Sequence, residues 1–432
     1  MNIPLLIFLF GIFVVIIVSY AIKDFDFVAI SLLGAFIAAL ITGLVYGLSF
    51  DTFVSFVEFE VIITILSMSI ITKIAQDFNI LEFLAIKLFK IARGDEKIFF
   101  YLICIITTLL AAIITDVVVV LILGPVIIRL CRVLKTQAGT YLLGMTICIN
   151  IGSIITPFSS GENIMISNYF HLDTLYFIRY YWLFSFGLLF LTIFLIDKFM
   201  LSKEPRVNPQ QKKLLIEMLD EKLLIENRKI FYFNSIALIV IIILFAIIPM
   251  LYFVAAVSAF ILVIVNKNIT KKKMRDLLGE IEWEIIFFFI SLYIVIGCLL
   301  VAGFREIFEM IPFEQLNVLV LSIIVLLVVS FTSGFVANTP TALAFIPIID
   351  ILIIKHHFPP MPLLFAFIIG INIGGNIIPQ GAACDMMTLK IATDEGVQNL
   401  SYKRLLKNGF IFAILHILSS ILFLFVIVFF IT

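Results

Sequence analysis

Acidic, amide and hydroxyl side chains gather at four places inside otherwise apolar stretches of this 432-residue chain. Two are short polar breaks, at Thr115-Asp116 and at residues 337–340, and two are glycine-rich stretches within residues 138–170 and 361–392. A charged side chain at the centre of a bilayer costs ~2.5–3.5 kcal/mol or more, so such residues are functional candidates by default. The candidate site residues are Asp116, Asn150, Ser153, Thr156, Ser159, Ser160, Glu162, Asn163, Asn338, Thr339, Thr341, Asn372, Asn376, Gln380 and Asp385.

A fixed offset of 222 residues relates these polar positions. Asp116 corresponds to Asn338, and Asn163 corresponds to Asp385. Each half of the chain therefore has one carboxylate and one amide at these two positions, in opposite order. Half-helix N-termini and unwound carbonyl groups at such breaks favour ion binding. We therefore expect Na⁺ at two groups of residues, namely Asp116, Asn150 and Asn163, and Asn338, Asn372 and Asp385.

Helix capping is the alternative role for the four related positions. Asp and Asn are among the best N-cap residues, and each of the four could begin a half-helix. Capping and ion binding are compatible. Glu162 adds a third carboxylate that capping does not explain, and its alternative is a solvated position at the mouth of the site.

The composition indicates which fold must position these residues. Apolar residues make up 63% of the chain and charged residues 13%, whereas globular domains have about 45–50% and about 25%. The formal net charge is zero, so no basic surface is available for nucleic acid. Long uncharged apolar runs recur from end to end, which predicts an all-α polytopic membrane protein and excludes a soluble or disordered chain.

The lengths of the apolar runs predict spans and hairpins. A spanning helix needs ~20 apolar residues. The regions 98–134 and 315–355 are too long for one helix and have a central polar break, so we expect a re-entrant hairpin in each. The predicted spans are 3–22, 27–48, 55–75, 138–170, 178–199, 231–250, 251–266, 284–303, 361–392 and 408–431, of which 138–170 and 361–392 are broken helices.

The two halves of the chain carry related sequences in one register. Ile149–Pro157 reads INIGSIITP and Ile371–Pro379 reads INIGGNIIP, with six of nine positions identical. Glu58 and Glu60 match Glu280 and Glu282 at the same offset of 222. Residues 1–200 and 231–432 are thus predicted to be two five-span repeats joined by a cytoplasmic linker, 201–230, which we expect to form a solvated helix. Five spans is an odd number, so the second repeat must be inverted relative to the first.

The distribution of basic residues predicts the orientation of the chain. Of 29 Lys and Arg residues, 26 fall on one predicted side and only Arg179, Arg305 and Lys355 on the other. The richer side is expected to be cytoplasmic. The first apolar run lacks the features of a signal peptide and is expected to remain as a span. These patterns predict a multi-pass plasma-membrane protein whose two termini both face outward.

Three segments resemble the ion-transporter superfamily, which includes arsenite efflux permeases, the melanosomal P protein, citrate and dicarboxylate carriers and some sodium–proton antiporters. They are TDVVVVLILGPVIIRLCRVL, NIGSIITPFSSGENIMISN and GINIGGNIIPQGAACDMM, and the resemblance extends from about residue 25 to 430. The arsenite permease and P protein branch is the most similar by these motifs. The resemblance implies a homodimer that works by an elevator motion.

The chain departs from that branch at several site positions. Thr115-Asp116 replaces Asp-Asn, and Val118 and Val119 replace two threonines. Asp385 stands where the branch usually has Asn. Substrate identity is therefore not carried over. We expect transport of a small anion or weak acid, such as an arsenite-like oxyanion or a carboxylate, coupled to Na⁺ or H⁺. The alternatives are a sodium–proton antiporter and, from another class, an uncoupled ion channel.

Other functions and cofactors receive no support from the sequence. The chain lacks H-E-x-x-H and serine–histidine patterns, so an enzyme is disfavoured, and no cofactor is expected besides the coupling ion. The motif G-x-x-x-x-G-K-[ST] is absent, so ATP drive is not encoded here, although arsenite permeases can recruit a separate ATPase subunit. Three site carboxylates with no Lys or Arg nearby in the sequence disfavour a bare polyanion as substrate.

Overall fold

The computed structural model describes residues 2–21, 25–92, 95–134, 136–204, 225, 227–248, 250–270, 274–281 and 283–431. Their regular secondary structure is helical throughout, and these residues contain no strand. Eight of the described helices are long and apolar enough to cross a membrane. The predicted all-α, polytopic class is therefore confirmed.

The first half of the chain begins with long apolar helices, followed by a hairpin and a broken span. The paired helices α6 and α7 meet at the predicted break, because α6 ends at Ala111 and α7 begins at Asp116. The elements are α1 (Ile3–Ala21), α2 (Phe27–Tyr46), α3 (Phe50–Ser55), α4 (Phe59–Asp77), α5 (Ile80–Ile91), α6 (Glu96–Ala111), α7 (Asp116–Leu134), α8 (Ala138–Gly152), α9 (Gly161–Tyr169), α10 (Thr174–Tyr180), α11 (Trp182–Phe199) and the 3-10 turn η1 (Leu201–Lys203).

The second half has the same order of long helices, hairpin and broken span. Ala337 separates the two hairpin helices and adopts a φ of 85°, a conformation that is uncommon for a residue with a side chain. The elements are α13 (Arg228–Ile247), α14 (Leu251–Thr270), α15 (Met274–Gly279), α16 (Trp283–Ala302), α17 (Phe304–Glu309), η3 (Phe313–Gln315), α18 (Val318–Val336), α19 (Asn338–Ile354), α20 (Pro360–Gly374), η4 (Pro379–Gly381), α21 (Ala383–Asp394) and α22 (Tyr402–Ile431).

Some elements differ from the sequence expectations. The short helices α3, α5, α10, α15 and α17 were not predicted, because none is long enough to give the signal of a membrane span. Most of the predicted linker helix, together with Glu282, lies outside the described residues.

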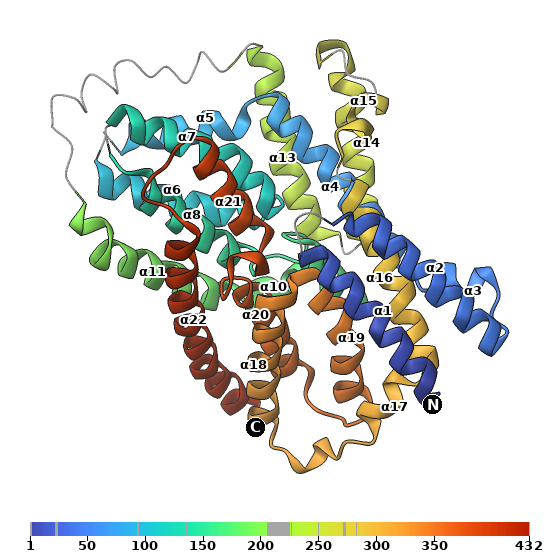
Figure 1. The fold of residues 1–432 in the computed structure, drawn as a ribbon. Coiled ribbons are helices and arrows are strands. Elements are labelled where there is room, and N and C mark those ends of the chain that lie inside the picture. Colours follow the sequence, from blue (N-terminus) through green and yellow to red (C-terminus); the bar gives the residue numbers. More distant parts are fainter. Residues whose placement is uncertain are drawn as a thin grey trace.

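Helices of one half pack against helices of the other. Helix α16 packs along α2, and α14 packs along α4. Within the halves, α6 packs on α8 and α18 packs on α20. Hairpin α6–α7 lies in the upper part of Figure 1 and hairpin α18–α19 in the lower part, while both chain termini lie at the lower end. The two hairpins therefore approach the middle of the molecule from opposite ends.

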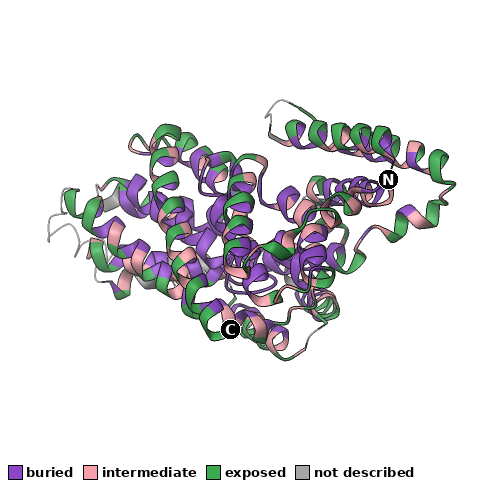
Figure 2. Ribbon diagram, turned by 90° about the horizontal axis from the view of Figure 1, so that it is seen from below, coloured by how far each residue is buried: buried purple, intermediate pink, exposed green. Residues whose placement is uncertain are grey.

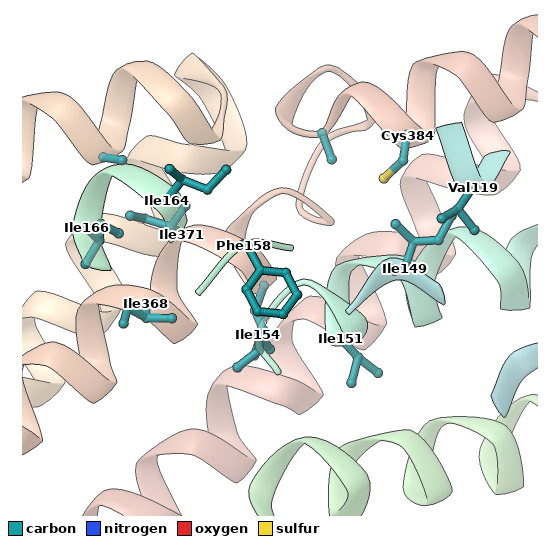
Figure 3. Packing of buried hydrophobic residues seen from close by; sticks show 14 of the residues in the cluster. Val119, Ile149, Ile151, Ile154, Phe158, Ile164, Ile166, Ile368, Ile371 and Cys384 are labelled. Atoms are coloured by element: carbon teal, nitrogen blue, oxygen red, sulfur yellow. The ribbon is translucent and has the colours of Figure 1, made fainter. Parts of the chain in front are cut away.

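The first helices of the two broken spans form the most enclosed part of the molecule. Every residue of α8 is buried, as is every residue of α20 from Pro362 onward. Figure 2 shows buried residues along the centre of the molecule and exposed ones on the peripheral helices. In Figure 3, Ile154 and Phe158 from the irregular segment after α8 lie among buried isoleucines of both halves. This apolar packing fixes the backbone at the breaks.

Glycine allows the broken spans to approach the hairpins closely. A Cβ atom at Gly152 would lie 2.4 Å from the carbonyl oxygen of Thr108, and one at Gly374 would lie 2.4 Å from that of Ser330. By contrast, a Cβ atom at Gly187, in α11, would have no other atom within 4 Å among the described residues.

We expect Gly152→Ala and Gly374→Ala to destabilise the protein, whereas Gly187→Ala should not. Backbone contacts cannot give way as a flexible side chain can, and overpacking costs about 1–3 kcal/mol. Thermal melting of the purified variants, followed by fluorescence size-exclusion chromatography, measures the difference. Equal melting temperatures for Gly152→Ala and Gly187→Ala would contradict the close packing.

Ion pairs connect α17 to α19 at the lower end of Figure 1. Arg305 lies 3.4 Å from the Asp350 carboxylate and 3.2 Å from that of Glu309, which also pairs with Lys355. The hydrogen bond from Lys355 lowers the pKa of Glu309 below its ordinary value. Two of the three basic residues expected on the outer side are thus paired with acids.

Candidate functional site

A cavity of about 220 Å³ lies where the two hairpin tips meet helices α4, α9 and α16. Glu162 and Asn338 line it and are buried, with 6% and 8% of their surfaces exposed. Glu280, Leu121 and Ala383 also line it and are exposed, so the cavity opens on their side. Apolar walls are contributed by α16 through Phe288 and Phe289 and by α4 through Ile65 and Met68.

Glu162 joins the broken span of the first half to the hairpin tip of the second. The Asn338 side-chain amide donates to Glu162 Oε1 at 3.2 Å, and the Thr339 hydroxyl lies 3.5 Å from Oε2. Asp116 begins the opposite hairpin helix and lines the same cavity, where its Oδ1 accepts from the Val117 backbone N–H at 2.9 Å. Polar groups from both halves thus converge on one cavity, which suits an ion or a small polar solute.

A second polar cluster lies beside the cavity, within the packed interior. Asp385 is 1% exposed, and its Oδ1 accepts from the Thr146 hydroxyl at 2.5 Å and lies 3.8 Å from the Cys384 sulfur. The Asn150 amide donates to the side-chain oxygen of Asn376 at 2.8 Å. The hydrogen-bonding groups around the Asp385 carboxylate are neutral, so its charge is suited to a cation or a proton.

A third cluster holds the irregular segment between α8 and α9. The Asn163 amide donates to the carbonyl oxygens of Ser153 at 2.5 Å and Thr156 at 3.1 Å, and the Ser159 hydroxyl donates to the same two carbonyls. Asn372 donates from the other half to the side-chain oxygen of Asn163 at 3.1 Å. These bonds satisfy carbonyl groups that an unwound helix would otherwise leave unpaired.

The predicted site residues therefore fall into a cavity group and two buried groups. The cavity contains Asp116, Glu162, Asn338 and Thr339, and Ser160 caps the neighbouring helix α9. One buried group contains Asn150, Asn376 and Asp385, and the other contains Ser153, Ser159, Asn163 and Asn372. The asparagine contacts run between the two halves, because Asn150 pairs with Asn376 and Asn163 pairs with Asn372.

Helix capping, the alternative role, does not hold at three of the four positions. Ser160 is the N-cap of α9, and its side chain accepts from the Asn163 N–H, so Asn163 is the third residue of that helix. Asp385 is likewise the third residue of α21, which follows Ala382. Asn338 follows the N-cap position of α19, and its side-chain oxygen accepts from the Ser333 hydroxyl. These side chains are thus used for tertiary contacts.

The alternative of a solvated Glu162 does not hold, and a basic residue lies near the site carboxylates although none is near them in the sequence. Glu162 is buried, because α19 and α16 cover it. Lys73, on α4, lines the same cavity as Asp116 and Glu162. Lys73 is distant from them in sequence, so only the polar spacing along α4 (Ser69, Thr72, Lys73 and Gln76) could have indicated that it faces a polar space.

Comparison with known proteins shows the family to which this chain belongs. The family model described as "Citrate transporter" (CitMHS) matches residues 12–351, which is most of the chain. The chain belongs to the citrate transporter family. The predicted membership of the ion-transporter superfamily is therefore confirmed, and the protein is a transporter and not an enzyme.

Curated relatives of this citrate transporter family member cover nearly its whole length. The 46 kDa membrane protein of Mycobacterium leprae is 25% identical and is aligned over 93% of this chain and 95% of its own. The uncharacterized transporter Rv2685 of Mycobacterium tuberculosis is 24% identical, with 94% and 96% aligned.

Two solved transporters have a similar fold. The YdaH transporter of Alcanivorax borkumensis superposes with a TM-score of 0.61 at 10% identity, covering 90% of this chain and 88% of its own. MtrF of Neisseria gonorrhoeae, described as illuminating a class of antimetabolite efflux pumps, has a TM-score of 0.60 at 12% identity, with 89% and 83% covered. These similarities show that the chain has the fold of these two transporters.

Proposed function

We propose that this member of the citrate transporter family is a secondary active carrier for a small carboxylate, with citrate as the first substrate to test. An arsenite-like oxyanion is the second. Transport is coupled to Na⁺ or H⁺. The observation that carries the proposal is the cavity in which Asp116, Glu162 and Asn338 meet, because hairpin tips from both halves define it.

An inverted repeat accounts for the arrangement of the helices. Helix α7 begins at residue 116 and α19 at 338, and α9 begins at 161 and α21 at 383, each pair 222 residues apart. The pairings of α2 with α16 and of α4 with α14 are equivalent under the same shift. Opposite placement of the two hairpins in Figure 1 supports inversion of the second half.

An elevator motion is part of the proposal, and the division of the cavity lining supports it. Helix α16 supplies an apolar wall and α4 a mixed one, whereas the hairpin tips and α9 supply Asp116, Glu162 and Asn338. We assign the first group to a fixed scaffold and the second to the moving unit. In the proposed orientation, which the distribution of basic residues supports, the α4 C-terminus lies in the cytoplasm, the cavity opens inward and both termini face outward. A homodimer in the plasma membrane is part of the proposal, with lipid covering the remaining apolar faces.

Sodium–proton antiport is the second candidate, and Asp385 favours it. A buried carboxylate among neutral donors can alternate between a proton and Na⁺ without any organic substrate. An uncoupled channel requires a continuous open path, whereas Glu162 and Asn338, which line the cavity, are buried and hydrogen-bonded to each other across the two halves.

Transport by purified protein in liposomes tests these functions. Radiolabelled citrate, arsenite and ²²Na⁺ are offered under a Na⁺ gradient, under a pH gradient and under neither. Accumulation of citrate or arsenite above equilibrium under one gradient supports the carrier. Gradient-driven ²²Na⁺ uptake with neither anion indicates antiport, and equilibration that no gradient drives uphill indicates a channel.

A further inference from the structure

Helix α4 presents a polar stripe to the cavity. Ser69, Thr72, Lys73 and Gln76 lie on one face of the helix, at the spacing of consecutive turns, and all four line the cavity. The Thr72 hydroxyl is buried and has no hydrogen-bond partner among the described residues. Packing alone does not require polar side chains here, so the stripe is suited to a polar solute.

Lys73 is the one basic residue among the described residues that line the cavity. Its ammonium lies 3.2 Å from the Glu280 carboxylate, and the two side chains are 35% and 32% exposed. Ion pairs with this much solvent contact contribute little to stability. A substrate carboxylate can therefore replace Glu280 beside Lys73 at little cost.

Charge is divided between the two walls of the cavity. Asp116 and Glu162 lie on the hairpin and broken-span side, where they suit coupling cations, and Lys73 lies on the α4 side. The position 222 residues after Lys73 is Val295, which is fully buried in α16. If the second repeat forms an equivalent cavity that opens outward, that cavity has no lysine at the position that matches Lys73.

We propose that Lys73 is the anion-selecting residue of the cavity, that it binds a carboxylate of a di- or tricarboxylate substrate, and that Glu280 masks it when the site is empty. This rests on the proposed function, namely that the chain carries a small carboxylate and that α4 belongs to the fixed scaffold. Because α4 stays in place, Lys73 meets the substrate only when the cavity opens to the cytoplasm. Its effect is thus confined to one side of the membrane.

Two substitutions with opposite expected effects distinguish this role from a structural ion pair. Lys73→Gln removes the cation and should raise the KM for citrate on the cytoplasmic side about tenfold or more, because a charged donor holds a carboxylate more strongly than a neutral one. Glu280→Gln removes the competitor and should lower the same KM. Lys73→Arg should stay close to wild type. If the pair only holds α4 to the start of α16, both glutamine variants break it and shift KM in the same direction.

The measurement uses the full chain and radiolabelled citrate. Inverted membrane vesicles report the cytoplasmic KM, and intact cells report the outer KM, which Lys73→Gln should leave unchanged. Arg132→Gln is the matched control, because it breaks an exposed 2.9 Å pair with Glu395 outside the cavity. Melting temperatures of all variants identify those that are misfolded.

The outcomes separate the two proposals. Active wild-type protein whose cytoplasmic KM is unchanged in Lys73→Gln, or shifts the same way in Lys73→Gln and Glu280→Gln, overturns the role of Lys73 and leaves the carrier function standing. An equal KM increase from both sides of the membrane overturns it as well. Wild-type protein that moves no citrate from either side overturns the carboxylate carrier, and the inference falls with it.

Discussion

Asp385→Asn is expected to abolish the dependence of transport on a Na⁺ or pH gradient while leaving the protein folded. The carboxylate is 1% exposed, and its described hydrogen-bond donors are the Thr146 hydroxyl at 2.5 Å and the Cys384 thiol at 3.8 Å. A charge at this depth requires a cation or a proton. Asparagine keeps the size of the side chain and can still accept from Thr146, so the substitution removes mainly the charge.

The expected decrease in gradient-driven transport follows from the coupling free energy between the ion site and the substrate site. Coupling free energies are typically about 1–3 kcal/mol, so the gradient-driven rate should fall roughly 5–150-fold. Asp116→Asn, on the cavity wall of the opposite half, should act similarly. Liposome uptake of citrate with and without each gradient measures the loss.

Asp350→Asn is the matched control for a buried aspartate. Asp350 is 7% exposed, but it already has a cation, Arg305, at 3.4 Å. Its substitution should change the melting temperature and leave the ion dependence intact. If both Asp116→Asn and Asp385→Asn retain the wild-type dependence on Na⁺ and pH, these two carboxylates do not bind the coupling ion.

The polar breaks could be predicted from the sequence because a membrane allows few alternatives. Apolar runs of 98–134 and 315–355 are too long for a single span, and their polar centres coincide with the helix ends at Ala111 and Val336. Glycine and proline in the INIGSIITP and INIGGNIIP segments indicated the breaks after Gly152 and Gly374. Length and backbone chemistry are local properties, so they can be recognised without tertiary structure.

Roles that depend on long-range contacts could not be predicted. Asp and Asn at a helix start favour capping in a local view, yet Asp385 is turned toward Thr146, which is 239 residues away in the chain. Glu162 is buried because Asn338, from the other half, covers it. Lys73 lies in the site because helix α4 lines the cavity, and no sequence motif connects it to Asp116. The sign and solvation of a site charge are set by such neighbours.

The substitution Glu162→Gln is expected to lower the rate of substrate transport about 10- to 100-fold with little effect on folding. Glutamine can still accept from the Asn338 amide, which lies 3.2 Å from Oε1, and its NH₂ group can face the Thr339 hydroxyl. Hydrogen bonds to charged groups contribute about 1.5–3 kcal/mol, whereas neutral ones contribute about 0.5–1.5. The loss is therefore one of charge inside the cavity rather than of the contact between the halves.

Glu58→Gln tests whether the effect belongs to the cavity. Glu58 also accepts from an asparagine amide, that of Asn168 at 3.3 Å, but it does not line the cavity. Initial rates of citrate uptake and melting temperatures are compared for both variants. Glu162→Ala should in addition lower stability by about 1–3 kcal/mol, because it leaves the buried Asn338 amide without this acceptor. If Glu162→Gln and Glu58→Gln transport at equal rates, the negative charge at the junction of the two halves has no part in transport, and Glu162 serves only to join α9 to α19.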